Sequence, residues 1–368
     1  MLQMFHGKRV LVTGDTGFKG SWLALWLHIL GAEVLGLALP PESPDDHFCV
    51  SGLNKLVDHV DADIRDAVGV NRAFTEFQPD FVFHLAAQPL VRRSYDDPKT
   101  TFDTNVSGSV NILEAVRATE SVRTLIYVTS DKCYRNREWV WGYRENDELG
   151  GRDPYSASKA AAEIVFSSYR DSFFRHRRGF GAASVRAGNV IGGGDWALDR
   201  IVPDCIRSLR RKCPIVVRSP HSVRPWQHVL DALYGYLLLA QKLVADPKEY
   251  SGSWNFGPDE GSVRSVQALA RTLVAVWGEG SIEFPQAEDP PSEARLLLLN
   301  CDKAHQQLDW HPLWHFDRAV GEAVHWYREW SRGEEARDLS HAQINMYMKE
   351  RKLLDLQSAV CHGQEVTR

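Results

Sequence analysis

The chain has 368 residues, of which 43% are hydrophobic and 25% charged, and its formal net charge is −5 at pH 7. This length fits one large domain or two fused domains, with a core that needs no disulfides. The acidic balance argues against a nucleic-acid-binding protein, and no apolar run is long enough to span a membrane. The six cysteines form no CxxC pair and the N-terminus lacks a secretory signal pattern, so we expect a cytoplasmic protein with reduced thiols.

Short apolar runs alternate with helical patterns through the first half of the chain. The runs of strand length are residues 9–13, 33–39, 80–85 and 124–130. Helical spacing of apolar residues is found at 21–30 and 100–119. This alternation predicts an α/β fold, with a Rossmann-type doubly wound parallel sheet that has helices on both faces.

The regular alternation ends near residue 187, where glycines and prolines become frequent. We therefore predict a dinucleotide-binding domain over residues 1–187, to which a segment near 224–255 returns. A smaller, mixed α/β C-terminal domain that binds the substrate would cover 188–335. Residues 336–368 are expected to form a C-terminal helix and tail.

A glycine-rich turn, Gly14-Asp15-Thr16-Gly17-Phe18-Lys19-Gly20, follows the first predicted strand and opens a helix. Glycines at such a turn let the backbone approach a pyrophosphate, whose charge then lies at the helix N-terminus. The same spacing occurs in ordinary βα turns. Its place directly after the first strand favours a dinucleotide.

The carboxylate that usually binds the ribose is expected at the end of the second strand. No acid occurs there before Glu42, and no Lys or Arg lies between Lys19 and Lys55. The missing cations mildly favour NAD over NADP, because a 2′-phosphate needs a positive partner. Asp63 and Ile64 lie where a third strand would end and could hold the adenine, although a solvated turn explains them equally well.

Tyr155 and Lys159 lie four residues apart, on one face of a predicted helix. The charge of Lys159 is expected to lower the pKa of the phenol, so that tyrosinate becomes an accessible base. A pair on a helix surface is the plain alternative. The stretch Thr129-Ser130-Asp131-Lys132 strengthens the catalytic interpretation, because it ends an apolar strand where open α/β sheets bind ligands.

Taken together, these motifs resemble the extended short-chain dehydrogenase/reductase family over roughly residues 5–330. Further matching segments are His84-Leu85-Ala86-Ala87-Gln88, Asn105-Val106 and Arg186-Ala187-Gly188-Asn189-Val190. Within that family the chain resembles the nucleotide-sugar 4,6-dehydratases, and their CDP-glucose subgroup most closely. The segments that carry this closer resemblance are 18–22, 130–134, 138–145, 150–155 and 224–229.

The resemblance implies an NAD-dependent hydro-lyase that oxidises the sugar at C4, eliminates water across C5 and C6, and reduces C6. Tyr155 would take the proton of the 4-hydroxyl, and Ser130 would hydrogen-bond the 4-oxygen. Asp131 would protonate the departing 6-hydroxyl. Lys159 would hold the nicotinamide ribose and tune Tyr155. In this picture the substrate is CDP-D-glucose, and the product is CDP-4-dehydro-6-deoxy-D-glucose, which relatives use for deoxysugars of bacterial surface polysaccharides (the O-antigen of lipopolysaccharide).

Lys132 departs from most dTDP- and GDP-sugar dehydratases, which have a glutamate at this position as the base for the C5 proton. As a base, Lys132 would have to be neutral, which requires desolvation or neighbouring cations. Alternatively, Lys132 stays charged and stabilises the enolate while another group takes the proton. The Asp-Lys pair itself fits the CDP-glucose subgroup.

The resemblance also implies two sets of binding residues. Those for the cofactor are Gly14, Thr16, Gly17, Phe18, Lys19, Gly20, Asp63, Ile64, Leu85, Ala86, Ala87, Asn105, Thr129, Tyr155 and Lys159. Those for the substrate are Gln88, Ser130, Asn189, Arg200, Arg218, Arg224 and Asn255. The arginines suit a diphosphate because of their bidentate geometry, although surface charges look the same in a sequence.

Three further expectations follow. No metal is expected, because the histidines form no HExxH motif. Residues 102–118 and 160–174 correspond to the helices that pair in relatives, which predicts a homodimer or a dimer of dimers. The alternatives are another 4,6-dehydratase (for dTDP-glucose or GDP-mannose), a nucleotide-sugar epimerase or reductase, or a non-catalytic NAD-binding protein.

Overall fold

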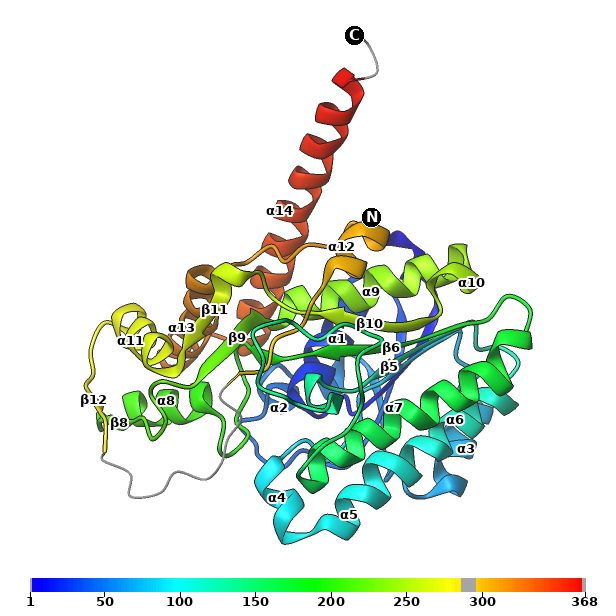
Figure 1. The fold of residues 1–368 in the computed structure, drawn as a ribbon, viewed down its shortest axis with the longest axis horizontal. Coiled ribbons are helices and arrows are strands. Elements are labelled where there is room, and N and C mark those ends of the chain that lie inside the picture. The colour runs from blue at the N-terminus through cyan, green and yellow to red at the C-terminus, as the bar shows by residue number, and fades with distance from the viewer. Residues whose placement is uncertain (1, 286–295, 366–368) are drawn as a thin grey trace.

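The computed structural model describes residues 2–285 and 296–365, with side chains as far as Leu354 (Figure 1). Its largest unit is a sheet with the strand order β10-β6-β5-β4-β1-β2-β3, in which every neighbouring pair is parallel. The strands are β1 (Arg9–Thr13), β2 (Glu33–Ala38), β3 (Asp58–Asp61), β4 (Phe81–His84), β5 (Thr124–Val128), β6 (Gly181–Ala187) and β10 (Gly252–Phe256). This sheet confirms the predicted Rossmann-type fold.

Helices cover both faces of the large sheet (Figure 1). One face packs against α3 (Ala67–Phe77), α6 (Ser109–Ala118) and α7 (Pro154–Ser172). The other face packs against α1 (Phe18–Ile29) and α9 (Val229–Ala245). The central strands are mostly apolar because both of their faces are buried. This burial of two faces explains why the strand positions could be predicted from short apolar runs.

Shorter helices complete the first half of the chain. They are α2 (His47–Val50), α4 (Val91–Asp96) and α5 (Pro98–Phe102), together with the π-helical turn η3 (Asp103–Gly108). The single helix predicted over 100–119 is therefore α5, η3 and α6 in succession. Apolar spacing predicts a helical segment here, but it does not reveal a π-helical turn within it.

The part of the chain after β6 forms two small sheets and a group of helices. One sheet has the order β11-β9-β7 and the other pairs β12 with β8. These strands are β7 (Asn189–Ile191), β8 (Ile215–Val216), β9 (Val223–His228), β11 (Val263–Ser265) and β12 (Ile282–Glu283). The helices are α8 (Ile201–Arg210), α10 (Pro247–Tyr250), α11 (Val266–Trp277), α12 (Asp302–Leu308), α13 (Phe316–Ser331) and α14 (Ala336–Glu365). Within this part, α9 and β10 return to the large sheet.

The C-terminal helix α14 packs against the body through its first turns and then projects away from it (Figure 1). Its buried residues include Ser340, Ile344 and Tyr347. Among the helices of residues 2–285 and 296–365, none combines the length and the apolar character that crossing a membrane requires.

The loops at the carboxyl edge of the large sheet gather the segments singled out from the sequence. The glycine turn follows β1, residues 85–88 follow β4, and the Ser130-Asp131 turn follows β5. All of these strands are parallel, so their carboxyl ends meet at one edge. A crevice at this edge is where open α/β sheets bind their ligands.

Candidate active site

The glycine turn after β1 has the geometry of a dinucleotide cradle. Gly14 has a φ of 76°, and a Cβ there would lie 2.7 Å from the backbone nitrogen of Ala86. A Cβ on Gly20 would lie 2.0 Å from the carbonyl oxygen of Gly14. Only glycine permits this close approach of α1 to the turn. The N-terminus of α1, capped at Gly17, therefore lies beside an open backbone surface that suits a pyrophosphate.

The segment after β5 forms the short 3₁₀ helix η4 (Asp131–Cys133), which Ser130 caps. The Ser130 hydroxyl donates to Asp131 Oδ1 at 3.0 Å and accepts from the backbone nitrogen of Lys132 at 3.2 Å. Ser130 and Asp131 are buried, whereas Lys132 is partly exposed. Burial raises the pKa of Asp131 against the opposing charges of Lys132 and Lys19 and the hydrogen bond from Ser130. A carboxyl with a raised pKa suits the role of a proton donor.

Tyr155 and Lys159 lie on the first turns of α7, which begins at Pro154 with Asp153 as its N-cap. The Asp153 side chain accepts from the backbone nitrogen of Ser156 at 2.9 Å, which satisfies one free donor of the first turn. Tyr155 and Lys159 are both buried beside the Ser130-Asp131 turn. The predicted hydroxyl, carboxyl, phenol and amine thus come together at one edge of the sheet.

The electrostatics of Tyr155 differ from the expectation. Burial raises the pKa of Tyr155 to about 12, a hydrogen bond with Ser130 and the charge of Arg200 oppose that rise, and Asp131 adds to it. Desolvation therefore outweighs the predicted lowering of the pKa of Tyr155, and Arg200 is a cation that opposes it. Burial and the charge of Lys19 lower the pKa of Lys159 to about 8.

Lys19 and Arg200 bring positive charge to the same cluster. Burial, then the charge of Arg200, lowers the pKa of Lys19 to about 8, while Asp131 and Asp195 oppose this shift. Arg200 pairs with Asp195 at 2.9 Å. Asp195 was not among the predicted site residues, and only its closeness to Arg200 in the sequence could have suggested it. Lys19 thus brings a charge from the glycine-rich segment that acts on Asp131 of the catalytic turn.

Three predicted ligand-binding residues have other partners in the structure. The Gln88 side chain bonds to the Leu90 backbone and to Thr101, and Asn105 bonds to the Gln88 backbone and Ser158. Asn255 is fully buried, with its amide donating to the carbonyls of Tyr143 and Asn300 and its oxygen accepting from Tyr134. Their polar groups have partners within the protein, so these side chains shape the loops around the site, and their contact with a ligand stays a prediction.

Thr129 also has an internal partner, since its hydroxyl donates to the buried carboxylate of Glu163. Glu163 and its ion-pair partner Arg186 were missed as functional candidates, although Glu163 stands four residues after Lys159 and Arg186 lies in a matched segment. Neither spacing by itself marks a site, because buried ion pairs are visible only after folding.

The remaining predicted residues lie at several places around the edge. The Asp63 side chain pairs with Arg65 at 2.6 Å, and Ile64 is buried against α6. Leu85 and Ala86 donate their backbone N–H groups to Thr13 Oγ1, each at 3.1 Å. In the second half of the chain, Asn189 begins β7, Arg224 lies on β9, and Arg218 is exposed just after β8.

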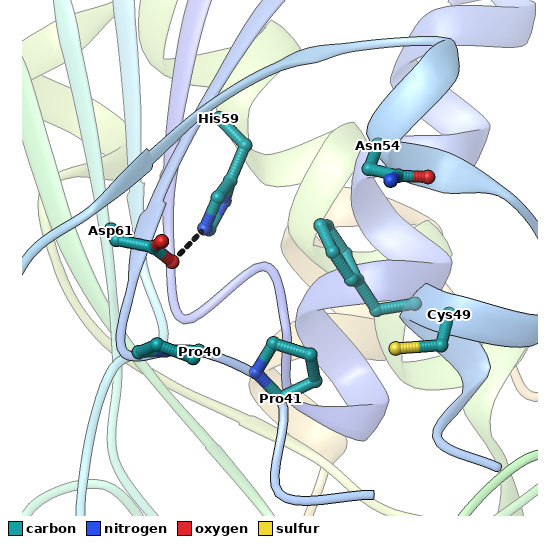
Figure 2. Close-up of a pocket in the computed structure, with 7 residues that line it drawn as sticks. Pro40, Pro41, Cys49, Asn54, His59 and Asp61 are labelled. Carbon is teal, nitrogen blue, oxygen red and sulfur yellow. Dashed lines mark hydrogen bonds and ion pairs between the residues drawn. The ribbon is translucent and has the colours of Figure 1, made fainter. Parts of the chain in front are cut away.

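A cavity of about 340 Å³ opens beside the carboxyl ends of β2 and β3 (Figure 2). Its lining residues are Pro40, Pro41, Phe48, Cys49, Asn54, His59 and Asp61. His59 bridges two carboxylates, with Asp15 of the glycine turn at 2.7 Å and Asp61 at 3.0 Å. Burial acts to lower the pKa of His59, but the bonds to Asp15 and Asp61 raise it overall. The lining residues include one acid, Asp61, and no lysine or arginine, which suits a ribose better than a phosphate.

Comparison with known proteins decides the family. A sequence profile described as GDP-mannose 4,6 dehydratase matches residues 11–323. CDP-glucose 4,6-dehydratase of Salmonella typhimurium is 47% identical over 348 residues, which cover 94% of this chain and 97% of that protein. The chain belongs to the nucleotide-sugar 4,6-dehydratase family. It is therefore a hydro-lyase.

Other relatives agree with this membership. CDP-paratose 2-epimerase of Salmonella typhi is 32% identical, and the match covers 83% of this chain and 94% of that one. Among solved structures, Thermus thermophilus UDP-glucose 4-epimerase in complex with NAD has a TM-score of 0.72 at 26% identity, covering 87% of this chain and 99% of that one. Bacillus anthracis dTDP-glucose 4,6-dehydratase in complex with NAD shares the fold, with a TM-score of 0.74 at 20% identity, covering 90% of this chain and 100% of that one.

Proposed function

We propose that this dehydratase converts CDP-D-glucose to CDP-4-dehydro-6-deoxy-D-glucose and water, with NAD as its cofactor. The observation that carries the choice of substrate is the 47% identity with a CDP-glucose 4,6-dehydratase over nearly the whole of both chains. The glycine cradle and the acidic cavity beside it support NAD. When bound, NAD+ would accept a hydride from C4 of the sugar and return it to C6.

The buried cluster supplies the proton transfers of this reaction. Tyr155 takes the proton of the 4-hydroxyl, while Ser130, which bonds with Tyr155, holds the 4-oxygen. Arg200 assists Tyr155, because its charge opposes the pKa rise that burial causes. Asp131 gives a proton to the departing 6-hydroxyl, a role that its raised pKa supports. Because the cluster is buried, these transfers are shielded from bulk water.

Lys132 is proposed as the base that removes the C5 proton. It follows Asp131 directly on η4, so the acid and the base reach the sugar from one short turn. Oxidation at C4 makes the C5 proton acidic, and a base on the same turn as the 6-hydroxyl donor suits elimination across C5 and C6. Lys132 is partly exposed, which leaves its amine accessible to the sugar.

The second half of the chain is proposed to bind the nucleotide. Residues 188–335, apart from the segment near 224–255 that returns to the large sheet, would form this domain. Arg218 and Arg224 remain candidates for the diphosphate, and Asn189 for the sugar. The charge of Arg200 acts on the phenol of Tyr155. We therefore assign Arg200 to the reacting end of the substrate rather than to the diphosphate.

A panel of sugar nucleotides tests the proposed substrate. We expect CDP-glucose to give a 4-keto product, detected by its absorbance in alkali, and dTDP-glucose, UDP-glucose and GDP-mannose to give little or none. The Asp131→Asn variant should lose about 100-fold or more of this activity, because an amide cannot supply the proton. A product from dTDP-glucose but not from CDP-glucose would overturn the assignment, and full turnover by Asp131→Asn would favour an epimerase.

A further inference from the structure

The carboxyl ends of β5, β6 and β10 carry a buried polar layer on the face that α7 covers. Nearer the amino ends, the same face is apolar and includes Leu125 and Ala182. At the carboxyl ends it changes to hydrogen-bonding residues, namely Thr129, Ser184, Arg186 and Asn255. A polar layer between a sheet and a helix requires partners on the helix, because unpaired buried polar groups are costly.

Glu163 of α7 is the partner at the centre of this layer. Its side chain is fully buried, and its two oxygens accept from the hydroxyls of Thr129 and Ser184. Arg186 Nη2 donates to the same carboxylate at 2.7 Å. Burial acts to raise the pKa of Glu163, but the charge and hydrogen bond of Arg186 hold it below its ordinary value. Glu163 is therefore a buried anion.

Arg186 extends the layer to the segment behind the catalytic turn. Its Nη1 donates to the hydroxyl of Tyr134 at 2.6 Å and to the carbonyl of Glu145 at 3.0 Å. Tyr134 follows η4 directly, so one guanidinium ties β6, α7 and the chain after η4 together. Buried ion pairs contribute little net stability, since desolvation offsets their attraction. A role beyond stability is therefore worth seeking for this pair.

Lys159 lies one helical turn before Glu163, on the same face of α7. The titratable groups that act on Lys159, or on which it acts, are Lys19 from α1, Cys133 from η4, His84 from β4 and Glu163 itself. Burial raises the pKa of Cys133 well above its ordinary value, and burial lowers that of His84 to about 3, so both are neutral. Cys133 and then Glu163 oppose the effects of burial and of Lys19 on the pKa of Lys159, and of these two Glu163 is the ionised acid.

We propose that Glu163, held in place by Arg186, is a positioning residue that keeps the Lys159 ammonium charged and fixes α7 against the catalytic end of β5. The proposal rests on the proposed function only in giving Lys159 a role at the cofactor. Lys159 can hold a ribose through charge-assisted hydrogen bonds only while it is protonated. Removal of the negative charge of Glu163 should therefore make Lys159 lose its proton at lower pH.

The pH profile of kcat tests this coupling. In the wild-type enzyme we expect kcat to fall as pH rises through about 8, where Lys159 deprotonates. Glu163→Gln should move this basic limb down by about half a pH unit or more. Glu163→Asp keeps the charge, so its limb should stay close to that of the wild type, although kcat falls because the carboxylate is displaced. A basic limb that is unchanged in Glu163→Gln, or absent from the wild type, would overturn the proposal.

Two further variants separate the causes. An arginine at position 159 stays charged at all these pH values. In the Lys159→Arg background, Glu163→Gln should therefore no longer shift the basic limb of the kcat profile. An equal shift would assign that limb to Asp131 and overturn the proposal.

Thr129→Val removes one hydrogen bond to Glu163 but keeps the charge of Glu163. It should lower kcat without moving the limb or KM. Should Glu163→Gln fail to fold in thermal unfolding, an unchanged kcat in both Thr129→Val and Glu163→Asp would refute the positioning role.

A second readout needs no sugar. The affinity for NAD+, measured by titration calorimetry across the same pH range, should weaken as Lys159 deprotonates, and should do so at lower pH in Glu163→Gln. Failure of the wild type to turn over CDP-glucose would refute the proposed substrate and leave this readout intact. An NAD+ affinity with the same pH dependence in both proteins would refute the role of Glu163 by itself.

Discussion

At the scale of single residues, Lys132 is the point where the chemistry of this dehydratase most needs a test. If Lys132 takes the C5 proton, Lys132→Ala should lose about 100-fold or more of the exchange of that hydrogen with D2O, and Lys132→Glu should restore part of it because a carboxylate can also act as a base. Mass spectrometry of the recovered sugar nucleotide measures this exchange.

The control for this test is Arg137→Ala, which removes an exposed cation of the same loop. It should leave the exchange unchanged. Normal exchange in Lys132→Ala would show that Lys132 stabilises the enolate by its charge and that another group takes the proton.

Asp61 is the residue we expect to decide between NAD and NADP. Asp61 ends β3 and lines the cavity beside the end of β2 (Figure 2). The end of β2 itself carries no acid that could bind the ribose. Asp61→Arg should replace a repelling charge by an attractive one and raise the affinity for NADP about tenfold or more, while the affinity for NAD falls. Titration calorimetry with both cofactors measures the change.

Asp58→Arg is the matched control, because Asp58 lies at the amino end of the same strand. It should leave the preference for NAD as in the wild type. Equal responses of the two variants would mean that the cavity is not part of the cofactor site.

The contacts that could be predicted from the sequence and those that could not differ in how far apart their partners are along the chain. The closeness of Ser130 to Asp131 follows from adjacency, and the shared face of Tyr155 and Lys159 follows from helical spacing. Asn255 contacts Tyr134, Tyr143 and Asn300, which are 45 to 121 positions away. No spacing rule shows such partners, so the hydrogen bonds of this amide could not be predicted from the sequence.

At the scale of elements, the helix α1 depends on buried histidine contacts. In α2, His47 hydrogen-bonds through Nδ1 to the Ser21 hydroxyl of α1 and through Nε2 to the Ser340 hydroxyl of α14, each at 2.9 Å. The ring of His47 also stacks on that of Trp22. Burial lowers the pKa of His47 to about 3, and burial also lowers the pKa of His84 and His228 to about 3. These rings are therefore neutral in the folded protein.

Neutral buried histidines predict a loss of stability in acid. Between pH 6.5 and about 3 the unfolded chain binds more protons than the folded one, so the free energy of unfolding falls as pH falls through 6.5. Each histidine contributes up to about 1.4 kcal/mol per pH unit. His47→Gln should make this decline shallower by about that amount, as measured by urea unfolding at several pH values. His221→Gln, at an exposed position, should leave the slope unchanged.

The elements themselves were largely predictable where burial is two-sided. Strand β1 spans Arg9–Thr13, which is the run identified in the sequence, because a strand buried on both faces is apolar without interruption. The prediction for residues 100–119 was less complete, because it gave one helix and missed the π-helical turn, which packs against α7. The small sheets of the second half have two or three residues in most strands, too few to produce a periodic pattern.

At the scale of the whole molecule, we propose a dimer formed by α5, α6 and α7. Apolar side chains are exposed on or beside these helices, namely Phe102 at 38%, Ile164 at 60% and Phe173 at 47%. Exposed apolar residues that gather on one side of a molecule often mark an interface. Ile164→Arg should therefore convert the dimer to a monomer in size-exclusion chromatography with light scattering.

Val216→Arg changes an exposed apolar residue of β8, outside the proposed interface, and should leave the dimer intact. A wild-type protein that elutes as a monomer would contradict the proposal directly. A dimer that survives Ile164→Arg would place the interface elsewhere.

The contact from α1 through His47 to α14 also determines when α1 can complete its packing during synthesis. A ribosome releases the chain from its N-terminus, so Ser340 emerges only when most of the 368 residues have been made. Until then Trp22 and Trp26 of α1 lack Trp326 and Tyr347, which cover this region in the finished protein. The helix that carries the cofactor cradle is thus completed by a segment that is synthesised long after it, since His47 and Ser340 are 293 positions apart. We therefore expect the nascent first half to expose apolar side chains of α1 until α13 and α14 have been made.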